Sequence, residues 1–236
     1  MIFVCGSKSM LLEGKTVRSN ATWLAMLVVL LVFANCQRHP ASSGSATGAR
    51  VPPRSTEWPV PQNASPQLRP FLASAIEQTR VTTGYDPAYV KIDYPGGDIP
   101  PETGVCSDVL IRAFRKAGID LQKELHEDMS AAWSAYPQRW GAAGPDSNID
   151  HRRVPNLMTF FKRKGKELPA TTSREDYLPG DVVAWDLGGG VGHIGIVSNL
   201  ASESPKHFLI IHNIGAGARA EDVLFNWKIT GHYRYF

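Results

Sequence analysis

The sequence of 236 residues contains few cysteines, little net charge and no phosphate-binding loop, dinucleotide-binding fingerprint or internal repeat. Its three cysteines, Cys5, Cys36 and Cys106, are too few for a disulfide-based scaffold. The 25 Lys and Arg residues nearly balance the 22 Asp and Glu residues, and a net charge of +3 gives poor support for nucleic-acid binding. With 43% hydrophobic and 20% charged residues, the composition is that of a globular protein, which excludes a disordered tail, a collagen-like rod and a coiled coil.

The chain also lacks a hydrophobic run of membrane-spanning length. Residues 21–34 form an apolar stretch that falls below the roughly 20 residues of a transmembrane helix. Basic residues precede this stretch and small residues end it, which predicts an export signal cleaved after Ala34. Two alternatives stay open, a lipoprotein signal with an acyl chain on Cys36 and an uncleaved anchor. We therefore predict that residues 1–36 direct export to the periplasm or cell envelope, with a membrane tether if Cys36 is lipidated.

Composition divides the rest of the chain into a linker and one domain. Residues 37–66 contain six prolines among Ser, Ala and Gly and show no apolar periodicity, which is typical of a tether. The alternative, an extended segment packed on the domain, applies to the stretch around Trp58. From Leu68 onward apolar residues recur at helical spacing, so we predict a single domain over residues 67–236.

The predicted domain begins with helices and ends with strands. Residues 105–117 place five apolar side chains on one helical face, and a second helix is predicted at residues 156–164. Runs rich in β-branched residues predict strands at residues 181–185, 193–198, 208–214 and 231–236. Helices followed by antiparallel strands indicate an α+β fold, with N-terminal helices packed on an antiparallel sheet or partial barrel.

Cys106 is the strongest candidate for a reactive group. It stands in the first turn of the helix predicted at 105–117, where free N–H groups and the helix dipole stabilise an anion, so we expect a lowered thiol pKa. The same N–H groups suit the oxyanion of an acyl-transfer intermediate. Asp108 would oppose thiolate formation if its carboxylate faced the sulfur. A buried structural cysteine is the alternative interpretation.

A cysteine nucleophile needs a base on a rigid element, and two histidines occupy successive predicted strands. Strand alternation puts His193, Gly195 and Val197 on one face. His212 lies on the next strand, where we expect it to sit beside His193 and to orient its imidazole. Each histidine alone is more often structural, but a helix-start cysteine followed by two strand histidines favours a Cys-His-His hydrolase site.

Several motifs carry a family resemblance. The segments GDVVAWD, GHIGIVSN and LIIHNIG resemble the strand signature of NlpC-type cell-wall cysteine peptidases, which form a papain-like superfamily. Residues 104–107, Gly-Val-Cys-Ser, are similar to the cysteine motif of that family, and residues 94–97, Tyr-Pro-Gly-Gly, to its Gly-Gly turn. The segment DSNIDHRRVPNL resembles a signature of a bacterial family of unassigned function in the same superfamily.

The resemblance implies a papain-like fold and assigns roles to four residues. Cys106 would be the nucleophile, His193 the base and His212 the orienting residue, and Tyr94 would help to stabilise the oxyanion. The chain departs from the family pattern at position 105, where Val replaces the usual Asp, and two residues after the cysteine, where Asp replaces Gly. Cys106 and His193 are 87 positions apart in the sequence, which implies an insertion.

Basic residues in this insertion form the predicted substrate-binding set. We expect Arg152 and Arg153 to grip a substrate carboxylate through bidentate contacts, with Ser107 completing the set beside the nucleophile. A solvated turn whose arginines pair with local acids is the alternative. The His-Glu-Asp cluster at 126–128 lacks a second histidine at metal-site spacing, so we expect a helix surface there and neither metal nor cofactor.

Together these observations predict an exported, monomeric cysteine hydrolase that cleaves an amide bond in peptidoglycan stem peptides or another envelope amide. The envelope substrate follows from the predicted compartment and the family resemblance. Lipid acyl transfer or esterase activity on the same fold is an alternative that predicts an apolar groove. A non-catalytic envelope binding module predicts a sluggish thiol at Cys106. A zinc hydrolase using Cys106, His193 and His212 is a lesser alternative that predicts loss of activity on chelation.

Overall fold

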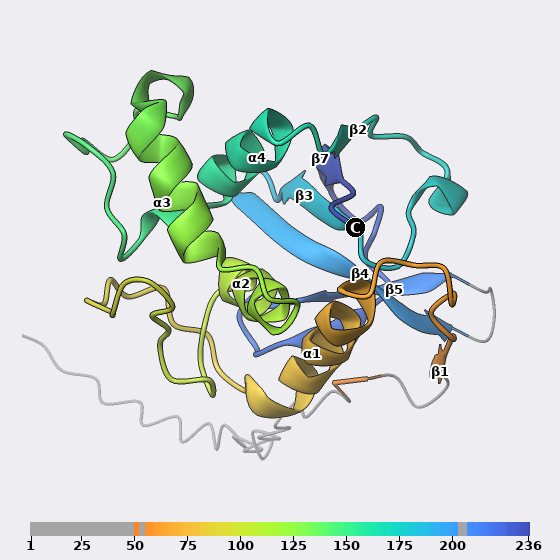
Figure 1. The fold of residues 1–236 in the computed structure, drawn as a ribbon. Helices are drawn as coiled ribbons and strands as arrows, with labels where there is room; N and C mark the ends of the chain where they lie inside the picture. Colours follow the sequence, from red (N-terminus) through yellow and green to blue (C-terminus); the bar gives the residue numbers. More distant parts are fainter. Residues whose placement is uncertain (1–49, 52–54, 203–206) are drawn as a thin grey trace, which may run out of the picture. The chain divides into compact units, whose positions relative to one another are not determined.

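The computed structural model describes residues 50–51, 55–202 and 207–236 (Figure 1). The predicted export signal and much of the predicted linker lie outside the described residues. In the described part of the chain, no helix is long and apolar enough to cross a membrane. The described residues form α-helices followed by an antiparallel sheet, so the predicted α+β fold class is confirmed.

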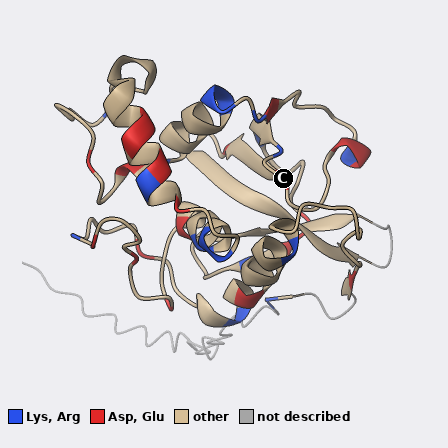
Figure 2. Ribbon diagram, in the orientation of Figure 1, with Lys and Arg blue, Asp and Glu red and all other residues tan. Residues whose placement is uncertain are grey.

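The sheet is antiparallel at every described strand pair. It runs in the order β2-β7-β3-β4-β5-β6, and β1 pairs with β4. The strands are β1 (Ser55–Glu57), β2 (Glu167–Leu168), β3 (Val182–Asp186), β4 (Gly192–Ser202), β5 (Phe208–His212), β6 (Arg219–Glu221) and β7 (Lys228–Tyr233). β4 and β5 contain no Lys, Arg, Asp or Glu (Figure 2). They are almost entirely buried, so the two predicted histidines belong to the centre of the domain.

The described residues include four α-helices. They are α1 (Leu68–Val81), α2 (Cys106–Lys116), α3 (Leu121–Ala131) and α4 (Val154–Arg163), with short 3-10 helices at η1 (Trp133–Ala135), η2 (Asp150–Arg152) and η3 (Arg174–Asp176). Of the four, α1, α2 and α4 contact the sheet, and α3 packs on α2 and α4. The helices α1 and α2 contact each other and β4, and both lie in front of β4 in Figure 1. Two of these helices coincide closely with the predictions at 105–117 and 156–164.

Alternation along β4 separates two hydrophobic clusters. Ile194 and Ile196 pack in the larger cluster with the helices, whereas Val197 packs in a smaller cluster on the other face. Gly195 leaves room for its neighbours, because a Cβ there would meet Ile210 and His212. The predicted two-residue alternation is therefore present, and it directs the helix-facing isoleucines and the histidine-bearing face to opposite sides.

Part of the predicted linker belongs to the folded domain. β1 pairs with β4, and the N–H of Trp58 donates to the carbonyl of Asn199 at 2.8 Å. The Asn199 side chain returns a hydrogen bond of 2.7 Å to the carbonyl of Trp58. The first half of β4 pairs with β3, and its last residues extend past β3 and pair with β1. The folded domain therefore begins upstream of residue 67.

The last strand differs from its prediction by three residues. β7 begins at Lys228 and has Gly231 inside it, whereas the sequence suggests a strand that starts at Gly231. Glycine is required there, since a Cβ at position 231 would collide with the ring of Tyr233. A glycine that marks close side-chain packing within a strand resembles, in sequence alone, a strand boundary.

Candidate active site

Cys106 is the first residue of α2 and lies in a pocket. The pocket has a volume of about 350 Å³, and its lining includes Tyr85, Trp140, Arg153 and Gly192. Only 7% of Cys106 is exposed. The helix begins here because the Asp108 carboxylate accepts a hydrogen bond of 2.7 Å from the N–H of Val105, which satisfies a donor that the helix itself leaves free.

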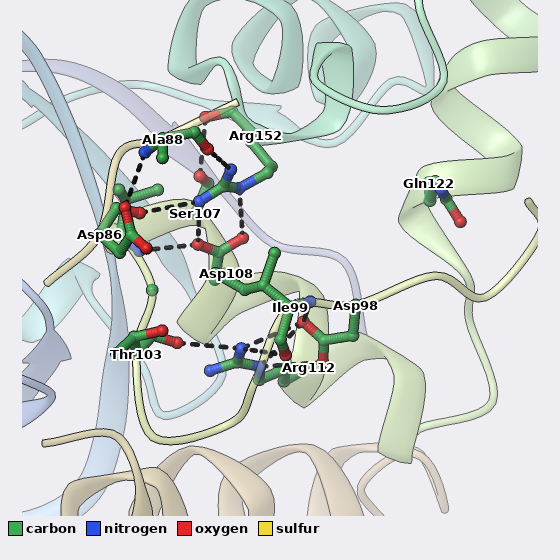
Figure 3. A network of polar contacts seen from close by, with 12 residues as sticks. Asp86, Ala88, Asp98, Ile99, Thr103, Ser107, Asp108, Arg112, Gln122 and Arg152 are labelled. Atoms are coloured by element: carbon green, nitrogen blue, oxygen red, sulfur yellow. Dashed lines mark hydrogen bonds and ion pairs between the residues drawn. The ribbon is translucent and has the colours of Figure 1, made fainter. Parts of the chain in front are cut away.

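The capping carboxylate of Asp108 is held by a buried arginine (Figure 3). Arg152 donates to both carboxylate oxygens, at 2.9 and 3.0 Å, and to the carbonyls of Ala88 and Asp86 at 2.8 and 3.0 Å. Ser107 donates from its hydroxyl to the carbonyl of Arg152 at 2.7 Å. A buried carboxylate needs such a countercharge. Arg152 and Ser107 were predicted to bind substrate. In the structure, the Arg152 guanidinium and the Ser107 hydroxyl donate to groups of the protein.

A second arginine fixes the loop that leads into Cys106. Arg112, on α2, donates to the Asp98 carboxylate at 3.0 Å and to the carbonyls of Ile99 and Thr103 at 3.2 and 3.1 Å (Figure 3). Both ends of this loop are therefore bound by the helix that carries the cysteine. The position of the thiol depends on α2 and on the loop before it as one unit.

The two predicted histidines form a hydrogen-bonded chain that ends on a carboxylate. Nε2 of His193 lies 2.8 Å from Nδ1 of His212, and Nε2 of His212 lies 2.9 Å from a carboxylate oxygen of Glu221. The members come from three neighbouring strands, β4, β5 and β6. Sequence analysis missed Glu221, because a three-residue strand has too few residues to show an alternating pattern.

The chemistry of the acceptors assigns the protons along this chain. An ionised carboxylate only accepts, so Nε2 of His212 carries a proton and donates to Glu221. In the form of His212 that carries only this proton, Nδ1 is an acceptor, and it receives the proton of Nε2 of His193. This arrangement leaves Nδ1 of His193 unprotonated. His193 therefore presents a lone pair on its remaining nitrogen, which a general base requires.

Burial keeps His193 neutral. The side chain is enclosed by Trp185 and Trp227, whose rings lie 5.8 and 5.9 Å from the imidazole, and only 2% of it is exposed. This burial, together with the nearby His212, lowers the pKa of His193 to about 3. A hydrogen bond from His212 lowers the pKa of Glu221, so the end of the chain remains ionised.

The Cys106 thiol is also neutral at rest, contrary to the sequence-based expectation of a lowered pKa. Burial raises the pKa of Cys106 to about 11, and the charge of Asp108 adds to this, while the N–H groups of Ile194, Ser107 and Cys106 itself oppose it. Desolvation outweighs the helix N-terminus because the sulfur is almost fully enclosed. The Cys106 thiol and the His193 imidazole are therefore both neutral at rest.

Cys106 lies beside the strand segment that carries His193. Gly192 lines the same pocket, and the N–H of Ile194 is directed at the sulfur. No hydrogen bond joins this sulfur to either imidazole in the described residues. The cysteine thus lies beside the start of β4, the strand that carries His193.

The tyrosine in the lining of the Cys106 pocket is Tyr85, which the sequence did not indicate. Tyr94, predicted to help stabilise the oxyanion, packs with its ring 5.1 Å from that of His126 and does not line the Cys106 pocket. Tyr85 lines that pocket, and its pKa is raised by burial and by the charges of Cys106 and Asp108. The structure therefore places Tyr85, and not Tyr94, at the pocket that contains Cys106.

Arg152 and Arg153, both predicted to bind substrate, line the pocket. Arg152 is paired with Asp108, whereas Arg153 donates to the Asp150 carboxylate at 2.8 Å and stacks on the ring of Trp140 at 4.2 Å. Nowhere in the described part of the chain do three or more His, Cys, Asp or Glu residues gather in a way that could hold a metal ion.

Two solved structures resemble the fold at low sequence identity. A protein from Staphylococcus aureus described as similar to a lipoprotein of the NLP/P60 family aligns with a TM-score of 0.37 and 16% identity, covering 78% of this chain. The present chain spans 44% of that protein. An N-acetylmuramoyl-L-alanine amidase from Bacteroides uniformis aligns with a TM-score of 0.40 and 13% identity, covering 72% of this chain and 98% of the amidase.

Sequence relatives define the family. The uncharacterized protein YijF of Escherichia coli K12 is 48% identical over 213 residues, which cover 90% of this chain and 97% of YijF. The profile of the family described as "Domain of unknown function (DUF1287)" matches residues 72–235, which include all the residues of the site. The chain therefore belongs to the DUF1287 family.

Proposed function

We propose that the protein is a cysteine hydrolase that cleaves an amide bond through an acyl-enzyme intermediate. The observation that carries this proposal is the chain from Glu221 through His212 to His193, which lies on the strand whose first residue, Gly192, lines the Cys106 pocket. Burying two imidazoles and assigning one tautomer to each is costly for a purely structural role, since apolar side chains of similar size would fill the same space without unmet polar groups. The arrangement suits a base of fixed orientation.

The reaction begins from the neutral pair. As the substrate carbonyl reaches Cys106, Nδ1 of His193 accepts the thiol proton while sulfur attacks the carbonyl carbon. The N–H groups of Cys106 and Ser107 and the phenol of Tyr85 are the candidate donors to the oxyanion. The His193 imidazolium then protonates the leaving amine. Water, activated by the same imidazole, hydrolyses the thioester and restores the thiol.

The orienting residues act on the proton transfer. The charge that forms on His193 is stabilised through Nε2, which donates to His212, and by the Glu221 carboxylate beyond it. Trp185 and Trp227 exclude water from the pair, which strengthens this electrostatic effect. His212 and Glu221 are accordingly positioning residues in the proposal.

The proposed substrate is an amide of the cell envelope, with peptidoglycan stem peptides as the first candidate. The export signal predicted at residues 1–36 and the resemblance to cell-wall cysteine peptidases support this assignment. Lipid acyl transfer needs an apolar groove, whereas the pocket at Cys106 is lined by three arginines. The pocket composition therefore favours a polar amide over an acyl chain.

A non-catalytic binding module is the second candidate, and one observation favours it. The raised pKa of Cys106 keeps the thiol protonated at neutral pH, as expected of a cysteine that performs no chemistry. The hydrolase and the binding module differ in whether any turnover depends on this sulfur.

The decisive experiment is digestion of purified peptidoglycan by the full chain, with mass spectrometry of the products. Cys106→Ala is the inactive comparison, and Asn226→Ala is a matched control outside the pocket. We expect products that require Cys106, withstand EDTA and are unaffected by the control. The absence of Cys106-dependent products from peptidoglycan and from a panel of other envelope amides would refute the hydrolase and favour the binding module.

A further inference from the structure

The pocket at Cys106 has a strongly one-sided charge. Its lining includes Arg139, Arg152 and Arg153, and it includes no Asp or Glu. Arg152 is neutralised by its bidentate ion pair with the buried Asp108. The charge available to a ligand therefore comes from Arg139 and Arg153.

These two arginines differ in how far their hydrogen-bonding capacity is used. Arg153 donates from Nη1 to Asp150, and within the described residues its Nε and Nη2 have no hydrogen-bond partner. Arg139 is exposed and makes no hydrogen bond or ion pair to any described residue. Since guanidinium N–H groups bind planar oxyanions in a bidentate manner, both side chains have donors free for a ligand.

Trp140 holds one of these guanidinium groups in place. Its indole stacks on Arg153 at 4.2 Å, and 52% of the residue is exposed at the pocket. The backbone of Trp140 has a φ of 64°, in the left-handed region that bulky residues rarely adopt. A strained backbone that presents an exposed aromatic ring to an arginine is typical of a binding site.

We propose that Arg139 and Arg153, with Trp140 as a stacking platform, form a subsite for a carboxylate on the substrate. The inference rests on the proposed hydrolase, because it places this subsite in the same pocket as the Cys106 nucleophile. The pocket of about 350 Å³ is at the small end of ligand sites, so the carboxylate belongs to a residue next to the scissile amide. The preferred substrate is therefore an acidic peptide.

The test uses soluble muropeptides released from purified peptidoglycan, either untreated or with their carboxyl groups converted to primary amides. Cleavage is measured with the full chain, and binding is measured by calorimetry with Cys106→Ala, which separates recognition from turnover. Arg139→Gln is the main variant, because an exposed side chain without partners in the described residues can be replaced without loss of the fold. Lys123→Gln, on α3, removes an equal charge outside the pocket and serves as the control.

We expect amidation to lower both kcat/KM and affinity about tenfold or more, the usual effect of losing a charge-assisted hydrogen bond. Arg139→Gln should produce the same loss with untreated muropeptides and little further loss with amidated ones, and Lys123→Gln should change neither. Arg153→Gln should act in the same direction.

Other outcomes separate the two proposals. Cys106-dependent cleavage that is equally efficient with amidated muropeptides would overturn the carboxylate subsite and leave the hydrolase standing. No cleavage of muropeptides or of the panel of other envelope amides, combined with muropeptide binding that amidation and Arg139→Gln both weaken, would support the subsite and refute the hydrolase. No cleavage of any of these substrates, with binding insensitive to amidation, would overturn both.

Discussion

Replacing Glu221 tests whether the end of the histidine chain contributes to the proposed chemistry. Glu221→Gln keeps an oxygen that can accept the proton of Nε2 of His212 and removes the negative charge. Glu221→Ala removes both the acceptor and the charge. The two variants therefore separate the electrostatic contribution from the hydrogen bond that selects the His212 tautomer.

The structure gives the expected magnitude. Two hydrogen bonds of 2.8 and 2.9 Å and one intervening imidazole separate the carboxylate from the His193 ring. A separation on the order of 8 Å and an effective dielectric constant of about 20 correspond to roughly 2 kcal/mol of stabilisation of the imidazolium. Because 36% of the Glu221 side chain is exposed, screening reduces this to about 1 kcal/mol. Glu221→Gln should therefore lower kcat about fivefold at unchanged KM.

Glu221→Ala should have a larger effect. It leaves Nε2–H of His212 without its acceptor, and a lost hydrogen bond to a charged group costs about 1.5–3 kcal/mol. We expect kcat to fall by about tenfold to a hundredfold, because part of the His212 population adopts the other tautomer. Asp222→Asn is the matched control, since it removes the same charge one residue further along at a side chain that pairs with Arg174.

The assay combines turnover of peptidoglycan with nitrogen NMR of the imidazoles, which reports the tautomer directly. The expected result is a shift of His212 toward the Nδ1–H tautomer in Glu221→Ala, with a smaller change in Glu221→Gln. Equal loss of kcat in Asp222→Asn and Glu221→Gln would refute the reasoning, as would an unchanged tautomer in Glu221→Ala.

Three further predictions follow from the charges and burial. Alkylation of Cys106 by iodoacetamide should be slow at pH 7 and rise toward pH 11, because burial raises the thiol pKa to about 11; a midpoint below pH 8 would contradict this. Burial lowers the pKa values of His193 and His151 to about 3, so the unfolded state binds more protons between pH 3 and 6.5. The free energy of unfolding in urea should then fall as the pH drops from 6.5, by up to about 2.7 kcal/mol per pH unit, whereas a flat profile would exclude buried neutral imidazoles. Arg152→Leu should destabilise the domain by about 3–5 kcal/mol in thermal unfolding, and the double variant with Asp108→Leu should recover part of this loss; additive losses would argue against the buried ion pair.

The sequence predicted the parts of the site that depend on local pattern. Alternation along β4 and β5 was enough to place His193 and His212 on one face, because a strand has a fixed two-residue period. The helix start at Cys106 was also predictable from its apolar spacing. These features depend on neighbours within a few residues in the chain.

The features that the sequence did not reveal depend on contacts between distant segments. The pKa of Cys106 is set by enclosure, so a helix-start position alone suggested the wrong direction. Arg152 was predicted to face substrate because the pairing with Asp108, 44 residues earlier, cannot be read from charge spacing. Tyr85 and Glu221 lie in a loop and a very short strand, where periodicity carries no information.

The contact between Arg50 and β6, a strand at the edge of the sheet, has a consequence for the choice of fragment in experiments. The backbone of β6, which carries Glu221, receives a partner on its outer side, since Ala220 donates to the carbonyl of Arg50 at 2.7 Å. The Arg50 guanidinium also binds the carbonyl of Thr82, at the end of α1. A fragment that starts at residue 60 or 67 would lose this support and expose an edge strand, which frays more easily than an inner one. Measurements on such a fragment would underestimate the activity of the protein, because the segment around Arg50 supports β6 and thereby helps to hold the Glu221 carboxylate in place.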